Sequence, residues 1–413
     1  MLITADRVLT GTGTNTGTGA GAGTSARTDT GSGWDMGACV ENGAVLIDGG
    51  KIAAVGTHDE IRRVAEPGVR HIAHTGTLMP GLIDSHVHLI FDGSTDPVAG
   101  LRDTDEVLLD QMRGRAEELL RAGVTTARDL GDRNGLAFRV AAETADGRLA
   151  GPRILAAGTP ATPPGGHCHF LGGEVAGEKQ ARDLVRRNAD AGAAVIKVMT
   201  SGGGLTKDGP RSWQSQFSRE ELHALVDEAH TAGLPVAAHA HGADAIAEAV
   251  RAGVQTLEHC TWMTESGFDL RADVLRRIVD EDIAVGLTVS PHWRMLPQVF
   301  GEERAATMFD QIRQMADAGA NLLLGTDAGV QRTGFDGLPG ALSFYAHIGI
   351  PNARILAMAT HRAAHTLGLT DVTGRIAPGL SADLLLVDGD PLADLEALRT
   401  VRTVVAAGCV SGE

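Results

Sequence analysis

Between residues 82 and 326 the chain alternates apolar and amphipathic segments, and this alternation constrains the fold more than any other feature. Most of the apolar segments are separated by a helical pattern such as 219–232, which a capping box of Ser218 and Glu221 opens. Alternating strands and helices favour a parallel α/β fold, and eight strands predict a (β/α)8 TIM barrel. A doubly wound open sheet is the alternative, although no Gly-X-Gly-X-X-Gly motif follows the first strand. The predicted strands are 82–89, 124–130, 153–157, 194–199, 235–239, 256–260, 283–289 and 321–326.

Both ends of the chain carry further strand patterns. They predict a small β-sandwich domain that is formed by residues 1–78 together with 373–413, beside the barrel domain at 79–372. The Gly/Thr-rich tract 10–33 has almost no apolar side chains, so we expect a disordered loop there. The predicted terminal strands are 1–9, 43–48, 51–56, 382–388 and 401–408.

Composition limits the partners of this chain. Its 413 residues are 43% hydrophobic, enough for a large core, and its formal charge of -16 disfavours nucleic acid and anionic membranes. No segment approaches the roughly 18 apolar residues of a membrane span, and no secretory signal is evident, so we expect a cytoplasmic protein. Four widely spaced cysteines indicate neither disulfides nor a thiolate zinc site. We expect a small-molecule substrate and a homo-oligomer.

The first predicted barrel strand ends in His86-Val87-His88. Side chains on a strand alternate between its two faces, so His86 and His88 point the same way. Two neutral imidazoles on one face suit zinc and neighbouring divalent ions. Taken alone, the motif also fits a strand end with ordinary hydrogen bonds.

Other predicted strands end in further side chains that are compatible with a metal. They are Lys197 on the fourth, His239 and His241 on the fifth, His259 on the sixth and Asp327 after the eighth. In a barrel these strand ends form the face where active sites lie. The joint occurrence therefore predicts a metal site, with His239 as a ligand and His241, next to a glycine, as a substrate contact.

Lys197 lies in an apolar strand of a chain that contains only four lysines among 36 basic residues. Burial of an ammonium group costs several kcal/mol, and it lowers the lysine pKa so that a neutral amine becomes available. A neutral amine can add carbon dioxide and become a carbamate that bridges two metals. The alternative is a buried lysine that is paired with a carboxylate.

Two motifs, Pro-Gly-Leu-Ile-Asp-Ser-His-Val-His and Gly-Thr-Asp-Ala-Gly, together with the order His-X-His, Lys, His, His, Asp, resemble the amidohydrolase superfamily over nearly the whole chain. Segments 197–204, 217–230 and Ala-His-Ala-His-Gly are similar to its prolidase-like and imidazolonepropionase-related branch. The resemblance implies hydrolysis of an amide or peptide-like bond, often in Xaa-Pro or other substrates with a C-terminal carboxylate. It also implies two divalent ions, taken as zinc, held by His86 and His88 with Asp327, by His239 and His259, and by carboxylated Lys197 as a bridge.

Two such ions about 4 Å apart generate a hydroxide nucleophile from a shared water near neutral pH. Asp327 is then the expected general acid/base, and His241 the expected contact to the substrate. Ring deamination is a rival on the same fold, as is hydrolysis of a cyclic amide, lactone, carbamate or urea. A scaffold without catalysis is a third reading, which predicts missing ligands. The predicted substrate-binding residues are His167, Arg211, His241, His292 and Arg294.

Overall fold

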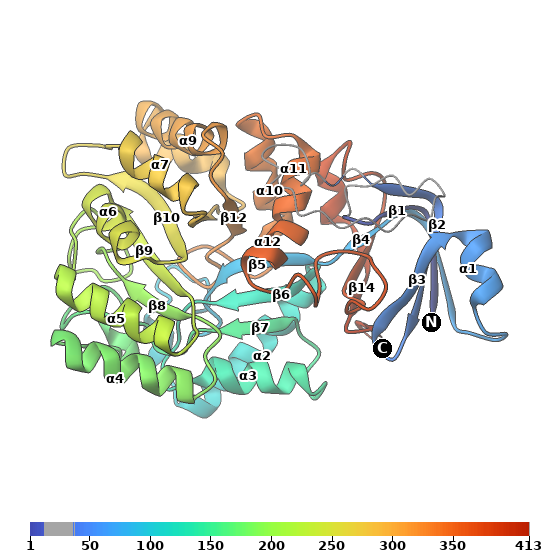
Figure 1. Ribbon diagram of the computed structural model, residues 1–413, viewed down its shortest axis with the longest axis horizontal. Helices are drawn as coiled ribbons and strands as arrows, with labels where there is room; N and C mark the ends of the chain where they lie inside the picture. Colours follow the sequence, from blue (N-terminus) through green and yellow to red (C-terminus); the bar gives the residue numbers. More distant parts are fainter. Residues whose placement is uncertain (12–35, 37, 413) are drawn as a thin grey trace. The chain divides into compact units, whose positions relative to one another are not determined.

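The computed structural model describes residues 1–11, 36 and 38–412, which form two compact units (Figure 1). The terminal unit comprises Met1–Ile83, Leu120–Thr125 and Tyr345–Glu413, and the central unit comprises Asp84–Leu119 and Thr126–Phe344. From residue 12 onward, the tract that we expect to be disordered lies outside the described residues. None of the described helices combines the length and apolar character that a membrane crossing requires.

A single seven-stranded sheet, in the order β15-β14-β13-β4-β1-β2-β3, organises the terminal unit. Strand β4 was not predicted, because the side chains of its first half, His71 to Gly76, show no regular alternation of apolar and polar types. It pairs parallel with β1 and antiparallel with β13, so it joins the N-terminal to the C-terminal strands. The second layer of a β-sandwich is not confirmed. The strands are β1 (Leu2–Leu9), β2 (Cys39–Asp48), β3 (Lys51–Thr57), β4 (His71–Pro80), β13 (Leu384–Val387), β14 (Val401–Ala406) and β15 (Cys409–Val410).

The turn between β2 and β3 follows from its glycines. Asp48 pairs with Lys51, and Gly49 and Gly50 adopt φ angles of 54° and 79°. Two successive residues with positive φ match the right-handed twist of a two-residue hairpin, and glycine adopts this conformation without steric cost. Apolar side chains from both chain ends pack on this sheet, among them Ile3, Val8, Val45, Leu78, Leu384 and Val405.

Eight further strands form two parallel sheets, one in the order β12-β11-β10-β9-β8 and one in the order β5-β6-β7. Single parallel bridges, Val87 with Ala328 and Ala161 with Val198, stand between the two sheets. The α/β architecture with parallel strands is confirmed, whereas a continuous ladder around a closed barrel is not. The strands are β5 (Leu82–Val87), β6 (Val124–Asp129), β7 (Arg153–Ala156), β8 (Ile196–Met199), β9 (Val236–Gly242), β10 (Thr256–Met263), β11 (Ala284–Thr288) and β12 (Leu322–Gly325).

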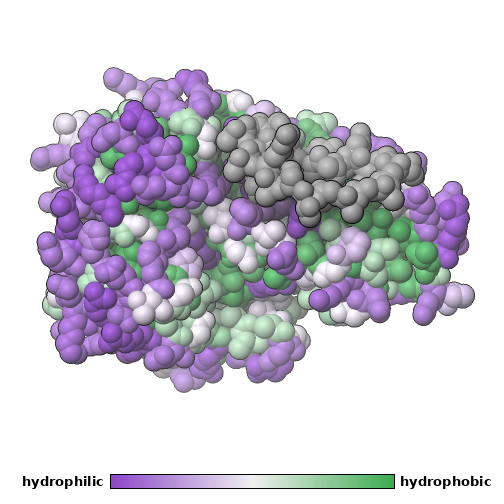
Figure 2. Space-filling view, viewed as in Figure 1, coloured by the Kyte–Doolittle hydropathy of each residue, from purple (hydrophilic) through white to green (hydrophobic). Residues whose placement is uncertain are grey.

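Helices separate most of these strands along the chain. The expected capping box is present. The Ser218 hydroxyl accepts a hydrogen bond from the Glu221 backbone N–H, and the Glu221 carboxylate accepts one from the Ser218 backbone N–H. Helix α4 buries Ala181, Leu184 and Val185, and the face that carries α4, α5 and α6 is predominantly hydrophilic (Figure 2). The α-helices are α1 (His58–Val64), α2 (Asp105–Arg121), α3 (Leu136–Ala145), α4 (Gly177–Asp190), α5 (Arg219–Thr231), α6 (Ala243–Ala252), α7 (Ala272–Asp280), α8 (Leu296–Phe300), α9 (Glu302–Asp317), α10 (Leu338–His347), α11 (Asn352–Met358) and α12 (His361–Thr366).

Candidate metal centre

The predicted ligands converge within the central unit, on its parallel strands or just beyond their carboxyl ends. His86 is in β5, Lys197 in β8 and His259 in β10, while Asp327 follows β12 by two residues. A cavity of about 250 Å³ lies over them. Predicted site residues that line this cavity are His88, His167, Lys197, His239, His241, His259 and Asp327.

A first group of ligand atoms consists of His86 Nε2, His88 Nε2 and Asp327 Oδ1. The two nitrogens are 3.3 Å apart, and each is 3.5 Å from the Asp327 oxygen. His86 Nδ1 donates to the Glu258 carboxylate at 2.8 Å and His88 Nδ1 donates to the Gly131 carbonyl at 3.1 Å. In neutral rings both Nε2 atoms therefore carry lone pairs. Three electron-rich atoms that face one another fit a cation.

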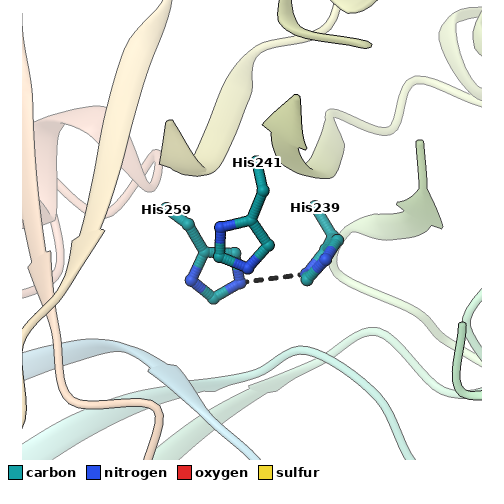
Figure 3. Close-up of side chains that lie close together, drawn as sticks. All are labelled: His239, His241 and His259. Carbon is teal, nitrogen blue, oxygen red and sulfur yellow. Dashed lines mark hydrogen bonds between the residues drawn. The ribbon is translucent and has the colours of Figure 1, made fainter. Parts of the chain in front are cut away.

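A second group consists of His239 Nδ1 and His259 Nε2, which are 3.0 Å apart (Figure 3). His239 Nε2 donates to the Gly202 carbonyl at 3.0 Å, so the lone pair of Nδ1 faces the cavity. The His241 ring stacks on the His259 ring with centroids 4.4 Å apart. His241 thus offers a third ligand atom beside the two predicted ones.

Burial sets the charge of these histidines. Loss of hydration disfavours the imidazolium, so the pKa values of His86, His88, His239 and His259 lie below the ordinary value. The same effect lowers the pKa of His241 to about 4. All five rings are neutral at pH 7, and neutral imidazole is the form that binds metal ions.

Lys197 and Asp327 each bury a polar atom that lacks a hydrogen-bond partner among the described residues, Nζ and Oδ1 respectively. Such atoms are uncommon in folded proteins, and here both belong to residues that line the same cavity. Burial lowers the pKa of Lys197 to about 8 and raises the pKa of Asp327. A substantial fraction of the Lys197 amine is therefore neutral near pH 8, as carbamate formation requires.

Two of the predicted ligands have strained backbone. His259 has a φ angle of 67° and Asp327 one of 61°, in the left-handed region that non-glycine residues rarely adopt. Each costs about 1–3 kcal/mol, and such strain concentrates at functional sites. Gly325 is needed for close packing, since a Cβ atom there would lie 2.7 Å from the Cβ atom of His86.

The predicted substrate contacts separate into two sets. His167 is 4% exposed, lines the cavity and lies with its ring centroid 4.6 Å from that of His239. Arg211, His292 and Arg294 are exposed and do not line the cavity, and Arg294 lies over the Trp293 ring at 4.3 Å. Their role as substrate contacts stays a prediction.

Two residues that contact the predicted ligands indirectly or directly were not predicted from the sequence. Glu258 contacts His86, and Arg128 contacts Glu258, yet neither residue belongs to the predicted site. One signal was available, because Glu258 is a carboxylate in an apolar strand next to His259. Its buried contact to β5 is a tertiary feature that sequence spacing does not reveal.

Comparison with known proteins gives two family matches. The profile of the amidohydrolase family matches residues 77–411, and that of the bacterial imidazolonepropionase-like composite domain matches residues 43–64. Ochratoxinase from Aspergillus niger is 28% identical over 408 residues, which cover 89% of this chain and 82% of the relative. Imidazolonepropionase from Mesorhizobium japonicum is 27% identical over 397 residues, with coverages of 86% and 88%.

Solved structures agree with these relatives. A Xaa-Pro dipeptidase with bound methionine superposes with a TM-score of 0.81 at 25% identity, over 99% of this chain and 98% of that one. A prolidase in complex with N-methylphosphonate-L-proline gives a TM-score of 0.79 at 26% identity, over 99% of both chains. The matched profile spans most of the sequence, and the relatives carry the names of hydrolases. The chain belongs to the amidohydrolase family.

Proposed function

We propose that the chain is a binuclear metal-dependent hydrolase that cleaves an amide or peptide-like C–N bond in a small substrate. The observation that carries the proposal is the arrangement of ligand atoms in two groups around one buried lysine. Lys197 lines the same cavity as His88 and Asp327 of one group and as His239 and His259 of the other. The two groups adjoin, because one ligand atom each of His86, His259 and Asp327 lies within 4.8 Å of the others. A lysine in the lining shared by both groups suits a bridging ligand.

His86, His88 and Asp327 would hold one ion, taken as zinc, and His239 and His259 the other. Lys197 would bridge them as a carbamate, which forms when the neutral amine adds to carbon dioxide and releases one proton. The carbamate supplies the anionic oxygens that a bare ammonium cannot. When bound, the two ions supply an activated water and polarise the scissile carbonyl.

Asp327 is the chain's candidate for proton transfer. Burial raises its pKa above the ordinary value, which makes the carboxylate a stronger base than one in water. It takes a proton at its carboxylate and delivers it to the leaving nitrogen. His241 and His167 line the same cavity and are assigned to contacts with the substrate.

The cavity and the relatives support a small amide substrate. A volume of about 250 Å³ lies near the lower end of the roughly 300–1,000 Å³ that small-molecule sites occupy. Similar proteins are a Xaa-Pro dipeptidase and a prolidase, which favours Xaa-Pro dipeptides and N-acyl amino acids as substrate classes. The likeness to imidazolonepropionase supports a second candidate, hydrolysis of a cyclic amide.

Metal analysis and a substrate panel test this proposal. Purified protein should contain about two divalent ions per chain, and Lys197→Arg should lose both the second ion and activity. Lys179→Arg is the matched control, because Lys179 is exposed on α4 and should keep both. A Lys197→Arg variant with two ions and full activity rules out the carbamate bridge. A panel of Xaa-Pro dipeptides, N-acyl amino acids and cyclic amides then identifies the bond that is cleaved.

A further inference from the structure

We propose that Glu258, held by Arg128, is a positioning residue that sets the metal affinity of the His86, His88 and Asp327 group. It acts through His86, whose tautomer and orientation it fixes. This inference rests on the proposed function, because it concerns an ion at that group. It goes further in assigning a role to a charged pair outside the predicted ligands.

The Glu258 carboxylate is fully buried, and both of its oxygens are engaged. Oε2 accepts from His86 Nδ1 at 2.8 Å. Oε1 accepts from Arg128 at 2.8 Å and from the Thr256 hydroxyl at 2.6 Å. The Arg128 guanidinium and two further donors surround the two oxygens, and this environment suits a carboxylate rather than a carboxylic acid.

Arg128 connects three strands, β5, β6 and β10, through its side chain. It is 2% exposed in β6, and its Nε donates to the Ser85 carbonyl at 2.7 Å, directly before His86 in β5. Another of its nitrogens reaches Glu258 in β10. The guanidinium thus fixes both the backbone beside His86 and the carboxylate that His86 contacts. It also joins the three-stranded to the five-stranded parallel sheet.

The neighbouring strand leaves room for this carboxylate. Glu258 pairs with Gly286 of β11, and a Cβ atom at Gly286 would lie 2.3 Å from Glu258 Oε2. Any larger residue at Gly286 would displace the oxygen that His86 contacts. Glycine at position 286 therefore leaves the space in which Oε2 contacts His86.

Among the five histidines of the centre, His86 alone has an anionic partner on its outer nitrogen. The outer nitrogens of His88 and His239 face the carbonyls of Gly131 and Gly202. A carboxylate makes the imidazole a better ligand than a neutral partner does, and loss of such partners typically weakens metal binding about 10–100-fold. The outer nitrogens of His241 and His259 contact the hydroxyls of Thr261 and Thr288.

Glu258→Gln is the informative substitution because it preserves shape. Glutamine has one carbonyl oxygen and one NH2 group. Arg128 and Thr256 both donate hydrogen bonds, so the carbonyl oxygen faces them. The NH2 group then faces His86 Nδ1, which favours the tautomer with hydrogen on Nε2. A protonated Nε2 has no lone pair for a metal.

Zinc affinity, measured by competition with a chelator, tests the inference. Glu258→Gln should bind one of two ions about 10–100-fold more weakly than the wild type. Glu143→Gln is the matched control, because Glu143 is likewise paired with an arginine, Arg113 at 2.7 Å, but belongs to neither group of predicted ligands, and its affinity should change less than about threefold. Unchanged zinc affinity in Glu258→Gln overturns the inference and leaves the proposed function intact. Wild-type protein without a tight zinc site overturns both.

A second measurement does not depend on whether the variant folds. In metal-free wild-type protein with ¹⁵N-labelled histidine, His86 should show a protonated Nδ1 and an unprotonated Nε2. Its signals are assigned by their loss in His86→Gln. A His86 ring with hydrogen on Nε2 contradicts the proposed role of Glu258.

Discussion

Replacement of Lys197 by methionine tests whether the buried amine destabilises the metal-free fold. Methionine keeps an unbranched stem of similar length but removes the nitrogen, which has no hydrogen-bond partner among the described residues. We expect Lys197→Met to lose metal ions and activity while the metal-free protein becomes more stable. A residue that serves only stability would give the opposite result.

The magnitude follows from the pKa of Lys197, which burial lowers from 10.5 to about 8. One pKa unit corresponds to about 1.4 kcal/mol, so the fold disfavours the ammonium by about 3 kcal/mol at pH 7. This cost is fully present below pH 8 and disappears as the pH rises from about 8 towards the ordinary value. At pH 10 the advantage of methionine should therefore fall below about 1 kcal/mol.

Urea unfolding in chelator and carbon dioxide-free buffer, at pH 7 and pH 10, measures this difference. The control is Lys179→Met on the exposed face of α4, which should change stability by less than about 0.5 kcal/mol at both pH values. Equal or lower stability of Lys197→Met at pH 7 would refute the reasoning. So would an advantage of the same size at both pH values.

Three further substitutions probe other contacts. Gly325→Ala places a Cβ atom 2.7 Å from that of His86, so it should cost about 1–3 kcal/mol in thermal unfolding and lower zinc content. Asp327→Asn removes the proposed proton acceptor and should reduce kcat about 10²–10⁴-fold in the amide assay; a smaller loss would assign proton transfer elsewhere. Ser218→Ala breaks the capping box with Glu221 and should cost about 1 kcal/mol without a change in KM.

The positions of the parallel strands could be predicted because each local pattern agrees with the whole fold. The predicted strand 256–260 begins where β10 begins, and the predicted strand 82–89 begins where β5 begins. Apolar runs of this length indicate a buried strand, and their alternation with helices indicates that the strands pair in parallel. His88 and Asp327 then fall at the same edge by topology alone. This is why candidate ligands could be proposed from the sequence without knowledge of their distances.

Strand β4 and residue Glu258 could not be predicted for a different reason. The pattern of β4 depends on what covers each face, and its exposed half lacks a regular apolar period. Glu258 depends on a partner 172 residues away, and no local rule places His86 opposite it. Buried polar residues are specified by their partners rather than by their neighbours in sequence.

The strained ligands connect these observations. His259, within β10, and Asp327, two residues after β12, hold left-handed backbone, which costs free energy when no contact compensates. A bound ion would supply that compensation, because it attracts the same lone pairs that repel one another in its absence. The strain and the unpartnered Lys197 amine therefore have one physical explanation. Both are costly in the metal-free chain, and a bound cation with a carbamate on Lys197 would offset both.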